Sequence, residues 1–145
     1  MIDHLWTILC SRCIIEADTN SISLIEVLEN VTVSAGGQPR FFEANWTLVT
    51  HWRRQGESLP NRGRARVELI APNGDSVGPI PVEYEIDLSN TERMRALVHI
   101  PFLPDCGNGL YRFRISLEAE GSPTWRDVFN YPIGITFQSP AVADG

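Results

Sequence analysis

The sequence predicts an all-β protein that folds as a single antiparallel β-sandwich of about eight strands. Two observations predict this class. Apolar and polar residues alternate with a period of two along most of the chain, which is typical of strands with one buried face. Turn residues separate these runs at the spacing of sandwich folds, and no long stretch holds a convincing helical period.

The composition is that of one globular domain. The chain has 145 residues, of which 43% are hydrophobic and 21% are charged, so it can bury a core without disulfide support. We assign residues 1–137 to the sandwich. The segment "QSPAVADG" at 138–145 lacks a strand pattern and reads as a flexible C-terminal tail.

The charge balance indicates which kinds of partner the protein can bind. The net charge is −6 and the pI is about 5.0, which argues against nucleic-acid binding because that requires a basic face. All twelve basic residues are arginine, which fits either codon usage or a need for bidentate contacts. "MIDHLWTILCSRC" has no basic region and only a short apolar run, so we expect no signal peptide, no membrane association and a cytoplasmic protein with reduced thiols.

The first half of the chain reads as three strands. The first, residues 5–15, is apolar on both faces, which places it centrally in a sheet or under a partner. The turn "EADTN" at 16–20 joins it to a second strand at 21–33, and together they form an N-terminal hairpin. "SAGGQP" at 34–39 breaks the chain. Residues 41–54 form a long third strand, with room for a short helical turn at its start.

The second half shows four segments with clear alternation. A polar loop at 55–63 precedes them, and a turn at Asn73-Gly74 and a loop at 89–93 separate the first three. The side chains expected to face the core are Ala65, Val67, Leu69 and Ala71; Ile80, Val82, Tyr84, Ile86 and Leu88; Ala96, Val98, Ile100 and Phe102; and Tyr111, Phe113, Ile115 and Leu117.

The last predicted strand, residues 125–137, contains a proline and a glycine. Proline cannot donate a hydrogen bond to a neighbouring strand, and glycine inside a strand often marks a bulge or a close approach of backbones. Pro132 and Gly134 therefore predict an edge, a bulge or a switch between sheets.

The stretch "PDCGNGLYRFRI" resembles the corner that leads into strand F of immunoglobulin-like sandwiches. In those domains a tyrosine hydroxyl bonds to the backbone a few residues upstream. The resemblance gives these roles to Asp105, Gly109 and Tyr111, and it implies an immunoglobulin-like arrangement. Phe113 stands where antibody domains have a disulfide cysteine, so the match concerns architecture alone.

A wider pattern covers most of the chain. The hairpin "CIIEADTNSISLIEVLENVTV", the turn "LIAPNGDSV" and the strand "GLYRFRISLEAEG" resemble a group of small bacterial proteins classed as domains of unknown function. Those proteins have an N-terminal hairpin, a sandwich with a "DPDG" turn and a "G-x-Y-x-F" strand. This chain departs from them in having "APNG" at the turn. The resemblance implies a fold and no activity.

The cysteines and histidines do not form a catalytic or metal-binding pattern. Asp105 beside Cys106 disfavours a thiolate, and His99 lies on an outward strand position, so we favour a turn residue over a nucleophile. Cys10 and Cys13 form a C-x-x-C on a predicted strand, where residues three apart point to opposite faces, which argues against zinc. The isolated loop aspartates argue against calcium. We expect no catalytic residue, no cofactor and no metal.

One surface feature stands out in the sequence, an arginine-rich loop with a tryptophan at its base. Arginine and tryptophan favour binding hot spots, so this feature predicts an interaction patch for an acidic partner. The alternative, which we favour over a binding patch, is a solvated strand face whose arginines pair with Glu68, Glu83 and Glu85 across the sheet. The predicted patch consists of Trp52, Arg53, Arg54, Arg62, Arg64, Arg112 and Arg114.

These observations favour a non-enzymatic protein-interaction or assembly module that binds a protein partner or a second copy of itself. The first alternative is a sandwich that binds a carbohydrate or another small ligand on its tryptophans. Trp46 and Trp52 share a strand face with Leu48, however, so at least one of them belongs to the core. The second alternative is an enzyme that uses Cys106.

Overall fold

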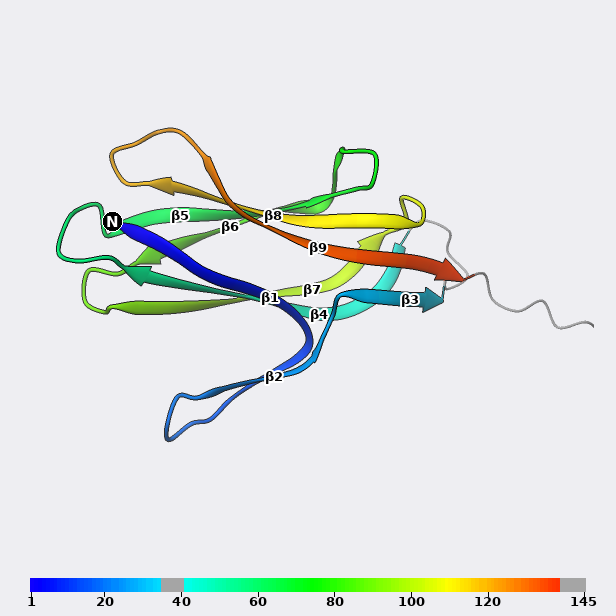
Figure 1. Cartoon of the computed structure of the whole chain (residues 1–145), viewed down its shortest axis with the longest axis horizontal. Helices are drawn as coiled ribbons and strands as arrows, with labels where there is room; N and C mark the ends of the chain where they lie inside the picture. The colour runs from blue at the N-terminus through cyan, green and yellow to red at the C-terminus, as the bar shows by residue number, and fades with distance from the viewer. Residues whose placement is uncertain (35–40, 139–145) are drawn as a thin grey trace, which may run out of the picture.

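The computed structural model describes residues 1–34 and 41–138, except for the side chains of Ser34 and residues 78–81. This part of the chain is all-β and consists of two packed sheets (Figure 1). The nine strands are β1 (Ile2–Ile15), β2 (Ile22–Val27), β3 (Asn30–Ser34), β4 (Phe41–Arg54), β5 (Arg62–Ile70), β6 (Ser76–Asp87), β7 (Arg93–Pro104), β8 (Gly109–Ala119) and β9 (Arg126–Gln138).

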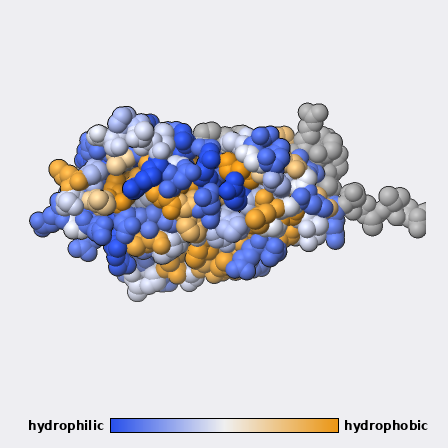
Figure 2. Space-filling model, turned by 45° about the horizontal axis from the view of Figure 1, so that its top comes forward, coloured by the Kyte–Doolittle hydropathy of each residue, from blue (hydrophilic) through white to orange (hydrophobic). Residues whose placement is uncertain are grey.

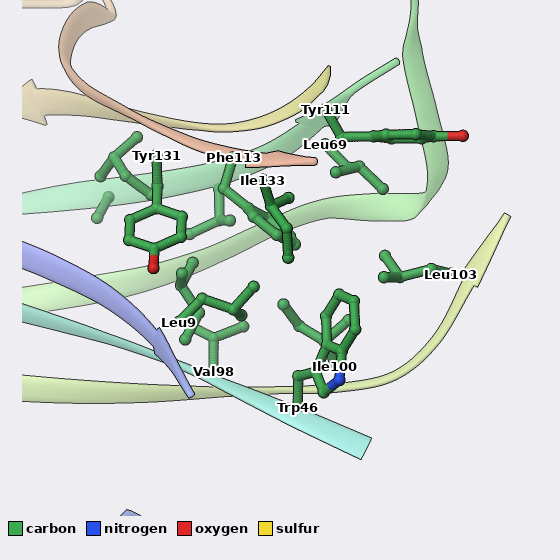
Figure 3. Packing of buried hydrophobic residues seen from close by; sticks show 14 of the residues in the cluster. Leu9, Trp46, Leu69, Val98, Ile100, Leu103, Tyr111, Phe113, Tyr131 and Ile133 are labelled. Atoms are coloured by element: carbon green, nitrogen blue, oxygen red, sulfur yellow. The ribbon is translucent and has the colours of Figure 1, made fainter. Parts of the chain in front are cut away.

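The strands form a four-stranded sheet in the order β2-β1-β4-β7 and a five-stranded sheet in the order β3-β9-β8-β5-β6. The hydrophobic core fills the space between them. Leu9 and Val98 reach into it from the four-stranded sheet, and Phe113 and Ile133 reach into it from the five-stranded sheet (Figure 3). The prediction of an all-β fold with two layers is confirmed.

The second predicted strand is in fact two strands that belong to different sheets. Glu26 has a φ of 55°, which disrupts the regular pairing of β2. The chain then crosses between the sheets at Leu28, whose N–H donates to Leu9 while its carbonyl accepts a hydrogen bond from the Tyr131 hydroxyl. This division raises the number of strands in the described residues from the expected eight to nine.

The β3 strand runs parallel to β9, so the prediction of a purely antiparallel sandwich is wrong for this pair. The close approach of the two strands explains Gly134, because a Cβ there would collide with the side chain of Asn30. Pro132 precedes the first residue of β9 that pairs with β3, so its missing N–H falls where no other described strand pairs with β9 on that side. Of the three alternatives predicted here, the structure gives a local edge at Pro132 within a strand that lies inside its sheet.

The β4 strand begins at Phe41 without a helical turn, so that expectation is wrong. Instead Asn45 has a φ of 52°, and the pairing with β7 shifts between Glu43 and Trp46. Opposite this shift, the inward-pointing residues of β7 change from even-numbered to odd-numbered positions. Phe102, which was expected in the core, is exposed, and Leu103 takes its place inside.

Elsewhere the predicted alternation is largely confirmed. In β8 the side chains of Tyr111, Phe113, Ile115 and Leu117 are all buried. The Tyr111 hydroxyl donates to the carbonyl of Gly107 at 2.7 Å and accepts from the N–H of Cys106 at 3.0 Å. This is the contact with upstream backbone that the corner sequence predicts.

Three predictions concern residues that lie wholly or partly outside the described part of the chain. Most of the predicted break at 34–39 and residues 139–145 of the predicted tail lie outside the described residues, and so does the side chain of Ile80. Gln138, the first residue of that tail, is the last residue of β9. Within the described residues, no helix has the length and hydrophobicity needed to cross a membrane.

Candidate interaction surfaces

The predicted arginine patch is divided between the two sheets. Trp52, Arg53 and Arg54 lie on β4 of the four-stranded sheet. Arg62 and Arg64 lie on β5, and Arg112 and Arg114 lie on β8, both in the five-stranded sheet. The residues therefore come from both sheets and not from the face of one sheet.

Trp52 does not belong to any surface, which corrects its place in the patch. Its side chain is fully buried, and its Nε1–H donates to the Tyr84 hydroxyl at 3.0 Å and to Thr50 Oγ1 at 3.1 Å. Trp46, which shares the same strand face, is also buried. The parity argument for a core tryptophan is confirmed, because the inward row of β4 faces the other sheet.

The two arginines at the end of β4 bind neighbouring parts of the same chain. Arg53 Nη2 lies 2.8 Å from Asp3 Oδ2 on the adjacent strand β1. Arg54 Nη1 donates to the carbonyls of Leu88 at 3.2 Å and Ser89 at 3.4 Å, beyond the end of β6. These contacts join the ends of strands and engage one nitrogen of each guanidinium.

On the five-stranded sheet, arginines pair with carboxylates across neighbouring strands. Arg64 contacts Glu118 of β8 at 2.7 Å and Glu83 of β6 at 3.5 Å. The hydrogen bond with Glu118 raises the pKa of Arg64. Arg62 contacts Asp87 of β6 at 3.4 Å. All of these side chains are well exposed except Glu118, so each pair contributes little to stability.

The centre of this charged face is Glu68, which is only 7% exposed. Its Oε2 accepts from Arg114 Nη2 at 2.6 Å and from Ser76 Oγ at 3.4 Å, and its Oε1 lies 2.9 Å from Arg66 Nε. The guanidinium of Arg66 also lies 4.3 Å from the centre of the Trp125 ring. A single carboxylate thus holds two arginines, and the indole ring packs against one of them.

The charged face therefore has the arrangement of the alternative reading, in which arginines pair within the sheet. Figure 2, in which the side of the five-stranded sheet is turned forward, shows strongly hydrophilic groups spread over hydrophobic surface. Arg112 is exposed, and among the described residues it alone of the predicted patch on this sheet has no ion pair.

A hollow of about 700 Å³ opens at one end of this face, between β5, β6 and the β8–β9 loop. Two arginines and four carboxylates line it, so its charge opposes an acidic ligand. Trp125 is half-buried, and the guanidinium of Arg66 lies over its ring, so a sugar could not stack on that side. The charged lining residues are Arg62, Arg64, Glu85, Asp87, Glu118 and Glu120.

The outer face of the four-stranded sheet has a different character. Residues paired across neighbouring strands share a face of the sheet. Leu48 and Val98 form an inward pair, so the adjacent row of Ile8, Val49 and Leu97 points outward. On either side of it run the outward rows Trp6–His51–Arg95 and Val27–Cys10–Thr47–His99. This outer face is thus mainly apolar near its centre.

The hairpin of β1 and β2 leaves the plane of the four-stranded sheet on this same side and forms a partial third layer in Figure 1. Arg95 Nη2 of β7 donates to the carbonyl of Asn20 in the hairpin turn at 2.6 Å. Beyond Cys10, β1 pairs only with β2, so the hairpin is a two-stranded ribbon. Such a ribbon is marginally stable by itself, and this one depends on the sheet against which it turns.

The hairpin and the four-stranded sheet expose large apolar side chains. Ile14 and Ile15 near the hairpin turn are 46% and 45% exposed, and Val27 at its base is 50% exposed. Leu97 of β7 is 44% exposed, and Phe102 further along the same strand is also exposed. The sequence indicated an apolar surface here, because the first strand is apolar on both faces. It did not show that these side chains would be exposed in the described part of the chain.

The three cysteines are free. Burial raises the pKa of the exposed Cys106 thiol, and Asp105 and Asp75 raise it further. Burial also raises the pKa values of Cys10 and Cys13, and these directions oppose the thiolate that nucleophilic chemistry needs. Among the described residues, no group of three or more His, Cys, Asp or Glu side chains is placed to hold a metal ion.

Comparison of the chain with protein-family models, with curated proteins and with solved structures gives no match.

Proposed function

We propose that this protein is a cytoplasmic, non-enzymatic interaction or assembly module, and that it binds a protein partner through the apolar side of its four-stranded sheet. The observation that carries the proposal is the hairpin, which exposes Ile14, Ile15 and Val27 beside an apolar sheet face. Large apolar surfaces of this kind mark protein-binding sites on soluble proteins.

The charged face supports the same choice by contrast. Except for Arg112, the predicted patch arginines of this face are held by Glu68, Glu118 and Asp87, so an acidic partner that binds them would have to displace existing ion pairs. The apolar side requires no such exchange, because covering it removes hydrocarbon from water. For this reason the proposed binding surface moves from the arginine patch to the hairpin side.

An immunoglobulin-like arrangement is part of the proposal. The sequence of neighbours β9-β8-β5-β6 corresponds to strands G, F, C and C′ of a variable-type domain, and the pair β4-β7 corresponds to B and E. The Tyr111 corner at the start of β8 supports this correspondence. In such domains binding is a common use of exposed loops and strand faces, although fold alone assigns no partner.

The test is a pull-down from the native host with three forms of the protein and mass-spectrometric identification of what they retain. The double variant Ile14→Ser, Ile15→Ser should lose the partners of the unaltered protein, because it makes the hairpin polar. Arg112→Glu, an exposed substitution on the opposite side, should retain them. The proposal is overturned if Arg112→Glu abolishes capture while the hairpin variant retains it.

A further inference from the structure

Strand β7 ends the four-stranded sheet, and in the described part of the chain its outer edge pairs with nothing. An unpaired edge presents a row of backbone N–H and C=O groups, which proteins ordinarily protect with charges, prolines or bulges. In β7 these protections stand toward the ends of the strand, at Arg93, Arg95, Pro101 and Pro104. The central stretch "ALVHI" at 96–100 contains no acidic residue, no arginine and no proline.

Strand β6 ends the other sheet on the same side of the sandwich, and it is protected throughout its second half. Glu83, Glu85 and Asp87 alternate along its exposed row. Antiparallel pairing of β6 with a copy of itself about Glu85 would place carboxylates opposite carboxylates, which is unfavourable. The contrast singles out β7 as the edge that is open to pairing.

We propose that β7 pairs antiparallel with β7 of a second copy of this chain, with Leu97 opposite Leu97 of the second copy. The pairing joins two four-stranded sheets into one continuous sheet with a twofold axis at Leu97. This inference rests on the proposed function and identifies one of its partners as the protein itself.

The register of the proposed β7–β7 pair follows from the exposure of Leu97 and from the positions of the arginines. A twofold axis at Leu97 buries the most exposed side chain of the apolar outward row against its own counterpart. The inward residue Ala96 then lies opposite Val98 of the second copy, and Arg95 lies opposite His99 of the second copy. No arginine faces another arginine, and apolar side chains meet on both faces of the extended sheet.

The space beside the β7 edge supports the same arrangement. A groove of about 400 Å³ lies between β6 and β7, where the two sheets are open at the side of the sandwich. Val82 and Tyr84 line it from β6, and Met94, Ala96 and Val98 line it from β7. The inward side chains of an added β7 strand would lie next to this groove and cover its apolar wall.

The first test measures mass by light scattering coupled to gel filtration at about 100 µM, above the micromolar dissociation constants expected of a small interface. The unaltered protein should show twice its chain mass of 16.3 kDa. Leu97→Glu should return it to a single chain, because two carboxylates would then meet at the axis. The matched control is Leu110→Glu, an exposed leucine on β8 of the other sheet, which should keep the doubled mass.

A single-chain mass for the unaltered protein would overturn the inference and leave the hairpin proposal standing, since that proposal is tested by capture with the Ile14→Ser, Ile15→Ser variant. A doubled mass in Leu97→Glu, with an unchanged circular dichroism spectrum, would also overturn it.

The second test reads the register. In a Cys106→Ser background, Leu97→Cys should form an intermolecular disulfide on mild oxidation, because the Cα atoms of directly opposed strand residues lie within disulfide range. His99→Cys in the same background should cross-link far more slowly, since His99 faces Arg95 of the second copy. Faster cross-linking through His99→Cys than through Leu97→Cys would overturn the pairing.

Discussion

The outer faces of the two sheets differ in what their side chains contact: carboxylates pair with arginines on one, and apolar residues meet a hairpin on the other. On the five-stranded sheet, Glu68 neutralises Arg66 and Arg114 from within the face. On the four-stranded sheet, the row of Ile8, Val49 and Leu97 meets a hairpin that covers it only in part. The comparison teaches that arginines close together in a sequence can be paired with carboxylates in the fold, so their number does not show how many donors are open to a partner.

The largest expected effect comes from breaking the charged face at its centre. Glu68→Ala should lower the free energy of unfolding by about 2 kcal/mol, because Arg66 and Arg114 then lose a partly buried partner. Urea denaturation measures this change.

Glu83→Ala is the matched control for that substitution. Glu83 is exposed and lies 3.5 Å from Arg64, so removing it should change stability by less than about 0.5 kcal/mol. Equal losses for the two variants would show that Glu68 does not organise the face.

A smaller effect is expected from two partly buried histidines, His4 and His51, as the pH falls. Burial lowers the pKa of His51, and Arg93 and Arg95 lower it further, while burial also lowers the pKa of His4. The unfolded chain therefore binds protons more readily, and stability should be complete above pH 6.5 and decline as the pH falls below it. Denaturation at several pH values measures the slope.

His51→Gln should flatten that slope in part, leaving the contribution of His4. His51 contacts Trp6 on the outer face, with ring centres 5.1 Å apart, so its proton affinity reports on this side of the molecule. A stability that rises as the pH falls from 6.5 would contradict the assignment.

The exposed ion pairs of the charged face should respond weakly to substitution. Arg62→Ala should change the free energy of unfolding by less than about 0.5 kcal/mol, since the pair with Asp87 is open to water and screened by salt. Thermal unfolding at low and high salt measures it, and a loss that salt does not reduce would show an additional packing role for Arg62.

The smallest expected effect on stability belongs to the hairpin. Ile14→Ser should leave the free energy of unfolding within about 0.5 kcal/mol of its original value, because nearly half of the side chain is already in water. The same variant should reduce binding of a hydrophobic dye to the native protein. A large loss of stability would mean that Ile14 supports the fold and is not a binding residue.

Much of the fold was predictable from local pattern. Alternation predicted the buried faces of β5 and β8, and the corner sequence predicted the hydrogen bonds of Tyr111. The reversal at Phe102 was not predictable, because it arises from a pairing shift with β4 that depends on Asn45 in another strand. The parallel pairing of β3 with β9 escaped prediction for the same reason, since it joins residues about a hundred positions apart in the sequence.

The candidate site shows the same division. Sequence reasoning found the arginines but placed Trp52 among them, and only the packing of β4 against Tyr84 shows that this ring is buried. It also noted that the first strand is apolar on both faces, but the partial cover of that surface depends on where the hairpin turns.

The sequence by itself determined the class of fold, the inward rows and the corner at Tyr111, because a period of two and a turn with its glycines are local properties. Within residues 1–34 and 41–138, the tertiary structure decided which charges neutralise each other, which edges stay open and which apolar side chains are exposed. These properties depend on contacts between distant strands, and the register of such strands is set by the packing of the whole sandwich.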